Sequence, residues 1–583
     1  MEKCAMVTSR LRPQVDRVFW CDLLILTIVM AIGLCLYGIP VLFTPDEGRY
    51  AEIAREMLVT HQYIVPHLDG IIYFEKPPMI YWLTALSLKL FGLNDWAARL
   101  PNPVLSLIGI WMSYVVCRIV FQKRSLALWG AIISGTSLLY LGGARYLNLD
   151  AGVAFFLNAT MLSFWASMQY SKKSYQGNLW LLVAFIFSGL AVMTKGLIGI
   201  VFPMMIIGLW SIFLSRWDVL KDIRLYLGLI VVAIISVPWV IMVNNIHHEF
   251  FHYYVIVQQI LRYATDEQGR QMSKFVYFGI FIIGFFPWFG FLPQVFNKLI
   301  STWRVRRHHA DEWFLFIWGM AILLFFAFSK SILIGYLIPI VIPFSILIAM
   351  RIEFSLSQKK DARSTKASFI AALILFALMG IAFIVLPFIP NFSMFFNEIA
   401  AYFWPAAVVC FIVSIFGFRL LRKKAYKAMM LSFVVTMMII LNLGWSGAQY
   451  FAQKSVKPLI PVVKPMLKAY PNAIVANYGG YFYDAQFYLD RLTWIVANAG
   501  ELENTANMPN SGAEKTLRTA EQFWPIWKSD QRVFMFTDKN NYERYFVSGK
   551  EHGILLAHTP KRYLLTNHQL PYKLRASGFN LNA

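Results

Sequence analysis

Charged residues with the pattern of an acid/base or cation-binding site follow the first long apolar segment of the chain. The stretch DEGRYAEIAREM begins at Asp46, and Pro45 before it is typical of a helix start. On a helix, Asp46, Arg49 and Tyr50 lie on one face at i, i+3 and i+4. A carboxylate there could act as a base or bind a cationic sugar, and the simpler alternative is a helix cap with local ion pairs. We take Asp46 and Arg49 as catalytic candidates.

A second motif, EKPP, occupies residues 75–78. Two consecutive prolines restrict the backbone and hold the preceding pair in an extended conformation. Lys76 is a compact charge suited to a phosphate, and Glu75 could orient it, act in catalysis or bind a metal. The simpler alternative is a lysine at the membrane interface.

Two further polar turns separate apolar segments. ARYLNLD, residues 144–150, contributes Arg145 and Asp150, and an arginine and an aspartate at membrane depth are more often functional than not. Asp150 could also be a helix N-cap. The turn SKSILIGY, residues 329–336, places Lys330 and Tyr336 near the surface, where they could bind a phosphate or only anchor the helix end.

Histidines gather in the region 247–252. His248 and His252 have i, i+4 spacing, which could present two imidazoles to a zinc ion, with Glu75 as a further ligand. Arg262 follows, and its guanidinium matches the geometry of a phosphate.

These residues sit in a chain of membrane-protein composition. Of 583 residues, 58% are hydrophobic and only 14% are charged, which excludes an ordinary soluble fold. The net charge of +22 comes from short basic clusters between apolar runs, so we expect no nucleic acid partner. The five cysteines have no metal-site or disulfide spacing.

The apolar runs predict about thirteen transmembrane helices. They cover residues 23–43, 98–121, 125–142, 151–170, 179–195, 197–214, 225–243, 276–296, 312–329, 332–350, 367–389, 400–418 and 427–449.

Basic clusters follow the even-numbered segments, and short basic connectors face the cytoplasm. This predicts a cytoplasmic N-terminus and a C-terminus on the outer side. Two long connectors, 44–97 and 244–274, then lie outside, and residues 79–91 within the first predict a short interfacial or re-entrant helix.

The composition becomes that of a soluble protein near residue 450. Strand-like runs at 473–477 and 532–537 alternate with polar helical stretches. We therefore predict a polytopic α-helical domain over residues 1–449 and a C-terminal α/β domain over residues 450–583.

Taken together, the motifs resemble the bacterial aminoarabinose transferase (ArnT) family, within the polyprenyl-phosphate-dependent membrane glycosyltransferases related to protein O-mannosyltransferases. The matching elements are DEGRYAEIAREM, YFEKPPMIYWL, ARYLNLD, MTKG, ILRY, SKSILIGYLIP, NYGGYFYDAQFYLDR and EQFWPIWKSDQRVF. The resemblance covers nearly the whole chain.

The resemblance implies a GT-C type fold with thirteen transmembrane helices and a periplasmic α/β domain. It implies transfer of 4-amino-4-deoxy-L-arabinose from undecaprenyl phosphate to a lipid A phosphate at the periplasmic face of the bacterial inner membrane. That reaction lowers negative surface charge and favours resistance to cationic peptides such as polymyxin. The expected partners are the lipid-linked donor, lipid A and membrane lipids, and the protein is expected to be a monomer.

The resemblance also assigns residues. Lys76, Arg262 and Tyr336 match family positions that hold the carrier-lipid phosphate, and Asp46, Arg49 and Asp150 match positions in the active cavity. Arg145 and Lys330 complete the predicted phosphate-binding set.

One departure concerns a metal. Glu75 matches a family zinc ligand, whereas the histidine expected five residues before Arg262 is Val257. We therefore expect no required cofactor, and zinc held by Glu75 with His248 or His252 is the alternative.

Two other functions are compatible with the composition. A related transferase could move another sugar, such as galactosamine or mannose, to lipid A, a glycan or a protein. A lipid or sugar transporter would also place charge inside a helix bundle, but inverted repeats and broken helices are not evident in the sequence.

Overall fold

The structure is a computed structural model. It describes residues 16–261, 272–329, 332–357, 363–390, 393–549 and 551–569. The chain divides into two compact units. Unit 1 contains Met1–Tyr37, Pro101–Met242 and Phe251–Gly447, and unit 2 contains Gly38–Leu100, Val243–Phe250 and Ala448–Ala583. The first long connector thus shares a unit with the C-terminal residues, which the sequence did not indicate.

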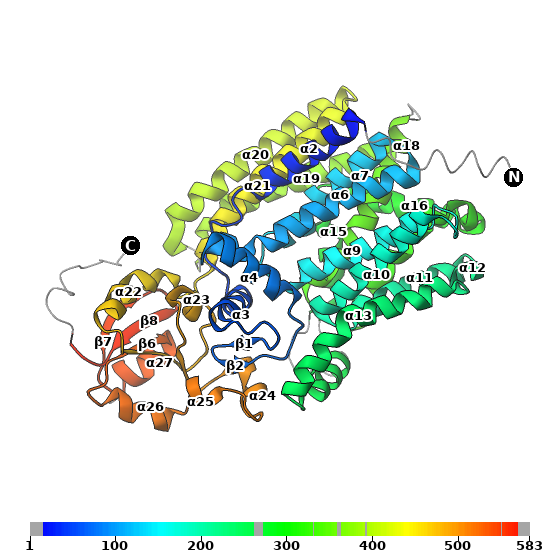
Figure 1. The fold of residues 1–583 in the computed structure, drawn as a ribbon. Helices are drawn as coiled ribbons and strands as arrows, with labels where there is room; N and C mark the ends of the chain where they lie inside the picture. Colours follow the sequence, from blue (N-terminus) through cyan, green and yellow to red (C-terminus); the bar gives the residue numbers. More distant parts are fainter. Residues whose placement is uncertain are drawn as a thin grey trace. The chain divides into compact units, whose positions relative to one another are not determined.

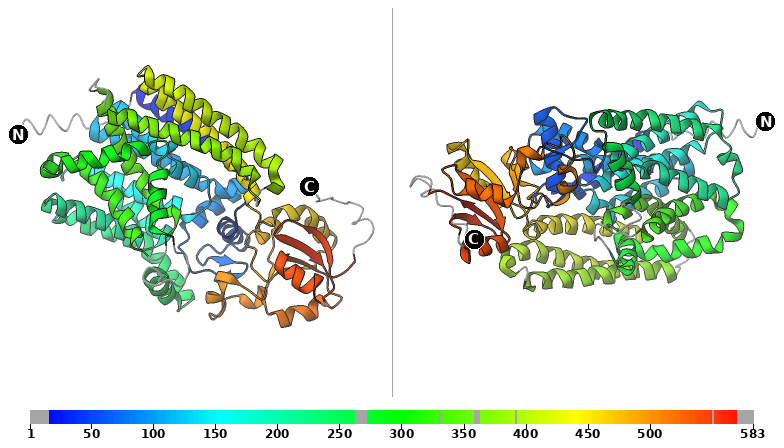
Figure 2. Two further views of the ribbon diagram at one scale, coloured as in Figure 1. Left: turned by 180° about the vertical axis from the view of Figure 1, so that it is seen from behind. Right: turned by 90° about the horizontal axis from the view of Figure 1, so that it is seen from below.

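Unit 1 is helical, and its long helices run side by side (Figures 1 and 2). Its described helices are α2 (Arg17–Leu34), α6 (Pro101–Phe121), α7 (Arg124–Thr136), α8 (Leu138–Gly143), α9 (Leu149–Ser167), α10 (Tyr175–Lys195), α11 (Ile198–Phe213), α12 (Trp217–Leu220), α13 (Ile223–Ile246), η1 (His252–Leu261), α15 (Lys274–Gly284), η2 (Phe289–Phe291), α16 (Leu292–Ser301), η3 (Trp303–His309), α17 (Ala310–Ala327), η4 (Ile334–Ile340), α18 (Val341–Ser357), α19 (Arg363–Val385), η5 (Leu386–Phe388), η6 (Ser393–Phe395), α20 (Phe396–Arg422) and α21 (Tyr426–Gly447).

Within the described residues, ten helices are long and apolar enough to cross a membrane, or eleven if one bent pair counts as a span. The chain is thus a multi-pass membrane protein. Thirteen spans were predicted, and three of the predicted segments do not form a single long helix in the structure. Residues 125–142 form α7 and α8, which are separated by extended backbone at Ser137. Helix α11 has only 16 residues. Residues 276–296 fall on α15 and α16, between which the helix axis bends by 103°.

Two predicted boundaries also differ. The first helix ends at Leu34 rather than near residue 43, because residues 35–43 form turns and irregular backbone. The connector predicted at 244–274 includes the helical segment η1 over His252–Leu261. Hydrophobicity alone does not indicate where the first helix ends or where η1 begins, since apolar residues lie on both sides of each boundary.

Unit 2 combines short helices with two sheets. Its elements are α3 (Asp46–Thr60), β1 (His67–Leu68), β2 (Ile71–Ile72), α4 (Met79–Phe91), α5 (Asp95–Arg99), η7 (Ala448–Phe451), η8 (Lys457–Leu459), α22 (Ile460–Ala469), β3 (Ile474–Tyr478), α23 (Ala485–Leu489), β4 (Trp494–Val496), η9 (Gly500–Leu502), α24 (Glu503–Ala506), α25 (Ala513–Thr516), β5 (Leu517–Arg518), α26 (Ala520–Trp527), β6 (Val533–Asp538), α27 (Lys539–Tyr542), η10 (Glu543–Val547), β7 (Ile554–His558) and β8 (Arg562–Thr566).

The larger sheet has six strands in the order β5-β4-β3-β6-β8-β7. The first four strands in this order are parallel, and β8 joins β6 and β7 antiparallel to both. The three last strands in sequence are red in the left view of Figure 2. The predicted α/β domain is confirmed, and the strands predicted at 473–477 and 532–537 are β3 and β6, shifted by one residue.

Strand residues alternate between two apolar layers on opposite faces of this sheet. Val475 and Phe534 pack in one core, which α22 and α23 complete. Ala476 and Met535 pack in the other core, with Phe523 of α26. Helices therefore cover both faces, which is why the central strands β3 and β6 are almost entirely buried.

Candidate functional site

The DEGRY motif forms the first turns of α3, where Arg49 is the central charge. Helix α3 begins at Asp46, directly after Pro45, as predicted. The Arg49 side chain is 3% exposed and forms ion pairs with Asp46 and with Glu501. The predicted helix face shared by Asp46 and Arg49 is confirmed, and the two side chains form the local ion pair of the simpler alternative. Glu501 is a partner that local spacing could not reveal.

Aromatic side chains surround the Arg49 guanidinium. It lies 5.3 Å from the ring centre of Tyr50 and 5.4 Å from that of Tyr483. The hydroxyl of Tyr73 is 3.4 Å from Nη1. Burial opposes the charge of Arg49, but its neighbours, Tyr73 and Tyr50 foremost, raise its pKa well above the ordinary value.

Asp46 differs from Arg49 in its access to solvent. Its side chain is 43% exposed, although Arg49 is buried. A fixed cation therefore holds one side of the carboxylate and leaves the other open to a ligand. This arrangement suits a carboxylate that positions a cationic group or accepts a proton.

The EKPP motif precedes α4, and Pro78 is its N-cap residue. Glu75 is 6% exposed. Lys76 is half-buried, and its Nζ donates to the main-chain carbonyl of Glu75 at 2.9 Å. The double proline thus fixes a buried acid next to a partly accessible ammonium group.

Glu47 and Arg99 form a buried ion pair that the sequence analysis missed. Nε and Nη2 of Arg99 donate to the two carboxylate oxygens of Glu47 at 2.7 and 2.6 Å, and both side chains are fully buried. Arg99 also donates to the carbonyls of Pro40 and Val41 at 2.6 and 2.9 Å. The main-chain N–H of Phe43 donates to Glu47 at 2.8 Å. The pair therefore ties the segment before α3 to α5, and an arginine at the edge of an apolar run was its only sequence signal.

A buried acidic network lies further along α3. Arg55 makes two hydrogen bonds to Glu52, at 2.7 and 2.8 Å, and a third to Asp490 at 2.9 Å. Glu56 and Asp69 are also buried, so three buried carboxylates accompany one arginine. Burial, reinforced by repulsion from Glu52, raises the pKa of Asp69 to about 8 and that of Glu56 well above its ordinary value.

This network predicts that alkaline pH destabilises unit 2. Because the pKa of Asp69 is higher in the folded than in the unfolded chain, the folded state binds more protons between about pH 4 and pH 8. Its contribution to stability is complete below the ordinary pKa and is lost as pH rises through 8. The slope is at most about 1.4 kcal/mol per pH unit for one group.

We expect Asp69→Asn to flatten this dependence in thermal unfolding measured from pH 5 to pH 9. The amide keeps an acceptor for the N–H of Thr493, now 2.9 Å away, and Gln486 can rotate its amide to face the new N–H groups. Asp530→Asn, an exposed aspartate of the same unit, is the control and should keep the wild-type slope. An unchanged slope in Asp69→Asn would contradict the assignment.

Unit 1 contains a second polar cluster. Asp150 forms an ion pair with Lys195, and the Lys195 ammonium lies 4.2 Å from the ring centre of Tyr336. Both charged side chains are about 15% exposed. The suggested N-cap role of Asp150 is wrong, because Asn148 is the N-cap and its side chain accepts from the N–H of Ala151. Lys195 belongs to the MTKG motif, and its partner lies 45 residues away, so spacing alone could not pair them.

Arg145 is buried inside unit 1. Its guanidinium donates to the carbonyls of Gly33 and Leu441 and, at 3.2 Å, to Oδ1 of Asn442. These contacts join the turn before α9 to α2 and α21. The role of Arg145 in phosphate binding stays a prediction.

The remaining predicted residues divide into two groups. Arg262 and Lys330 lie outside the described residues. His248 and His252 are described and exposed, but His248 lies in a turn before the helical segment, so the two do not share the regular i, i+4 face that was predicted. Nowhere in the described chain do three His, Cys, Asp or Glu side chains gather closely enough to hold a metal ion. Buried Glu75 and these exposed histidines do not fit a zinc site.

Comparisons with known proteins connect these features to a family. A family model described as dolichyl-phosphate-mannose-protein mannosyltransferase matches residues 19–254. An undecaprenyl phosphate-α-4-amino-4-deoxy-L-arabinose arabinosyl transferase from Erwinia tasmaniensis is 34% identical over 310 residues, which are 53% of this chain and 55% of the relative. A protein of the same name from Aeromonas hydrophila is 29% identical over 70% of this chain and 73% of its own length. The matched region is thus about half of the length of the first relative.

Solved structures extend the similarity over the whole fold. The crystal structure of ArnT from Cupriavidus metallidurans bound to undecaprenyl phosphate has 24% sequence identity and a TM-score of 0.81, and covers 95% of this chain and 99% of that chain. The apo form has a TM-score of 0.82 at 23% identity. These findings confirm the resemblance that the motifs indicated. The chain therefore has the fold of these ArnT structures.

Proposed function

We propose that this protein transfers 4-amino-4-deoxy-L-arabinose from undecaprenyl phosphate to a phosphate of lipid A. The observation that carries the proposal is the half-exposed carboxylate of Asp46, fixed by buried Arg49 in the same unit as Lys76. The names of the relatives and the undecaprenyl phosphate bound to the similar ArnT structure support this choice of donor.

The reaction exchanges one bond at the anomeric carbon. A lipid A phosphate oxygen forms a bond to C1 of the sugar as the bond from C1 to the carrier phosphate oxygen breaks, and undecaprenyl phosphate leaves with the electron pair. The acceptor is already anionic, so no strong base is required. Asp46 then positions the acceptor or pairs with the ammonium group of the aminopentose.

The leaving phosphate gains negative charge, and preorganised cations stabilise it. We assign Lys76 to this task, and the predicted phosphate-binding roles of Arg262, Tyr336 and Lys330 stay predictions. Within unit 1, Lys195 compensates the charge of Asp150, and its ammonium group lies over the Tyr336 ring. The chain needs no metal for these steps, and the same transfer assay with a chelator tests that expectation.

Lipid A analysis tests the proposal directly. Mass spectrometry of lipid A from a strain that lacks the native transferase but supplies the donor should show an aminopentose mass increment when this protein is expressed. An unchanged lipid A together with a hexose added to protein or glycan would instead support transfer of another sugar. A periplasmic location of Asp46 and Lys76 at the inner membrane is part of this proposal.

The same assay identifies the lysine. We expect Lys76→Ala to lower transfer by about 10²- to 10³-fold, as when a preorganised donor to a developing anion is removed. Lys89→Ala is the matched control, because Lys89 is an exposed lysine on α4 close to the motif. Equal transfer by both variants would exclude Lys76 from the site.

A further inference from the structure

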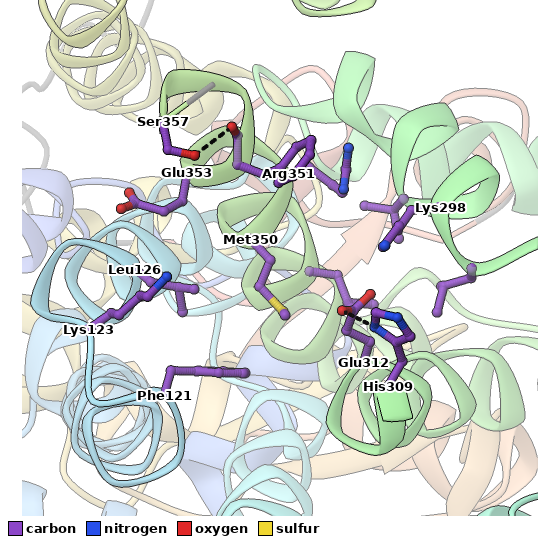
Figure 3. A pocket seen from close by; sticks show the side chains of 14 residues that line it. Phe121, Lys123, Leu126, Lys298, His309, Glu312, Met350, Arg351, Glu353 and Ser357 are labelled. Carbon is purple, nitrogen blue, oxygen red and sulfur yellow. Dashed lines mark hydrogen bonds and ion pairs between the residues drawn. The ribbon is translucent and has the colours of Figure 1, made fainter. Parts of the chain in front are cut away.

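A charged cavity of about 380 Å³ lies in unit 1, apart from the residues assigned to transfer (Figure 3). Side chains from the ends of α6, α17 and α18 and from α7 and α16 line it. Tyr336 and Arg351 mark opposite ends of the continuous helical segment η4–α18, and helix geometry separates them by roughly 20–25 Å. The cavity therefore belongs to the membrane face opposite Tyr336.

Three cationic side chains line the cavity. Lys298 of α16 and Arg351 of α18 point to the same side of it, and Lys123 lies across from them (Figure 3). Within the described part of the chain, none of the three makes an ion pair. The Nε of Arg351 is buried and has no hydrogen-bond partner there.

The two carboxylates of the lining already have partners. Glu312 pairs with Nδ1 of His309 at 2.8 Å. Glu353 accepts a hydrogen bond from the hydroxyl of Ser125, also at 2.8 Å. The lining therefore holds three cationic side chains against two carboxylates, together with a buried guanidinium N–H that has no hydrogen-bond partner in the described chain. A phosphate would balance this excess of one positive charge and accept from the guanidinium.

A neighbouring groove favours a lipid over a free anion. It has a volume of about 540 Å³, is lined by Phe296, Ile300, Trp303 and Trp313, and shares Leu299 with the charged cavity. Helix α16 lies between the two, with Lys298 on the charged side and Ile300, which is 71% exposed, on the groove. Tryptophan and exposed apolar residues of this kind are typical of the membrane interface.

We propose that the cavity of Lys123, Lys298 and Arg351 binds the phosphate of an anionic phospholipid, with one acyl chain in the adjoining aromatic groove. The basic connectors on this face predict that it is cytoplasmic, where anionic headgroups attract such residues. The site is distinct from the donor and acceptor sites, so its test does not depend on the transfer reaction.

Native mass spectrometry of the full-length protein in neutral detergent tests the proposal by titration with phosphatidylglycerol and, separately, phosphatidylcholine. The wild type should retain phosphatidylglycerol preferentially. A cation near an anionic membrane surface contributes roughly fivefold in affinity, so Lys298→Ala should weaken binding about fivefold and Lys298→Ala/Arg351→Ala roughly 25-fold.

The control removes two charges from the same face without touching the cavity. Lys173→Ala/Lys221→Ala replaces two exposed lysines of other basic connectors and should bind as the wild type does. If the double variant at the cavity fails to fold, the single Lys298→Ala variant, which removes a partly exposed side chain, still decides the result.

Three outcomes would overturn the inference. Equal binding of phosphatidylglycerol by the wild type and the Lys298→Ala variant would show that this cavity does not bind the lipid phosphate. An equal loss in the Lys173→Ala/Lys221→Ala control would show only a general charge effect. Binding of sn-glycerol 3-phosphate as tight as that of the lipid would identify a soluble phosphate as the ligand.

Discussion

Replacing Asp46 by asparagine should lower the transfer rate by about 10²- to 10⁴-fold, the effect typical of losing a positioned acid or base. Asparagine keeps the size of the side chain but loses the negative charge that would face the sugar ammonium or the acceptor. Arg49 retains its pair with Glu501, so the unfolding temperature should change little. Lipid A mass spectrometry and thermal unfolding of the same preparation measure the two effects.

Asp490→Asn is a closely matched control for this variant. Asp490 is 55% exposed and pairs with Arg55, a buried arginine that also keeps a second carboxylate partner, Glu52. The local chemistry therefore repeats that of Asp46 and Arg49 in the same unit, away from the DEGRY turn. We expect Asp490→Asn to transfer normally.

The comparison separates chemistry from structure. Loss of transfer in both variants, with lower unfolding temperatures, would mean that these carboxylates only stabilise unit 2. Normal transfer in Asp46→Asn would remove Asp46 from the reaction and leave the proposed site without its acidic group.

Features that depend on neighbouring residues were predictable. The start of α3 after Pro45 and the pairing of Asp46 with Arg49 follow from spacing on one helix. The strands β3 and β6 follow from apolar runs, because their side chains are buried on both faces of the sheet. Apolar segments likewise predicted helices over most of unit 1.

Features that depend on distant residues were not predictable. Glu501 lies some 450 positions after Arg49, and only folding of the C-terminal residues with the first connector places it there. Lys195 was visible in the MTKG motif but without a partner. The bend between α15 and α16 was hidden because a broken apolar run has the same hydropathy as a continuous one.

The buried pair of Glu47 and Arg99 carries the largest expected effect on stability. Both side chains have no exposure, and four of the hydrogen bonds around them hold residues 40–47 in place. Removing one partner leaves an uncompensated buried charge, which typically costs about 3–5 kcal/mol. We therefore expect Arg99→Ala to lower the unfolding temperature markedly and to abolish transfer as a consequence of misfolding rather than of chemistry.

A double variant distinguishes this explanation from a general loss of packing. Glu47→Gln/Arg99→Met removes both charges and keeps most of the side-chain volume, so no buried ion remains unpaired. It should be more stable than Arg99→Ala and should regain part of the transfer activity, although the carbonyls of Pro40 and Val41 lose their donor. If the double variant is instead less stable than Arg99→Ala, then the unpaired carboxylate of Glu47 does not cause the instability of Arg99→Ala. In that case the hydrogen bonds of Arg99 to the main chain, and not the ion pair, hold the DEGRY turn in position.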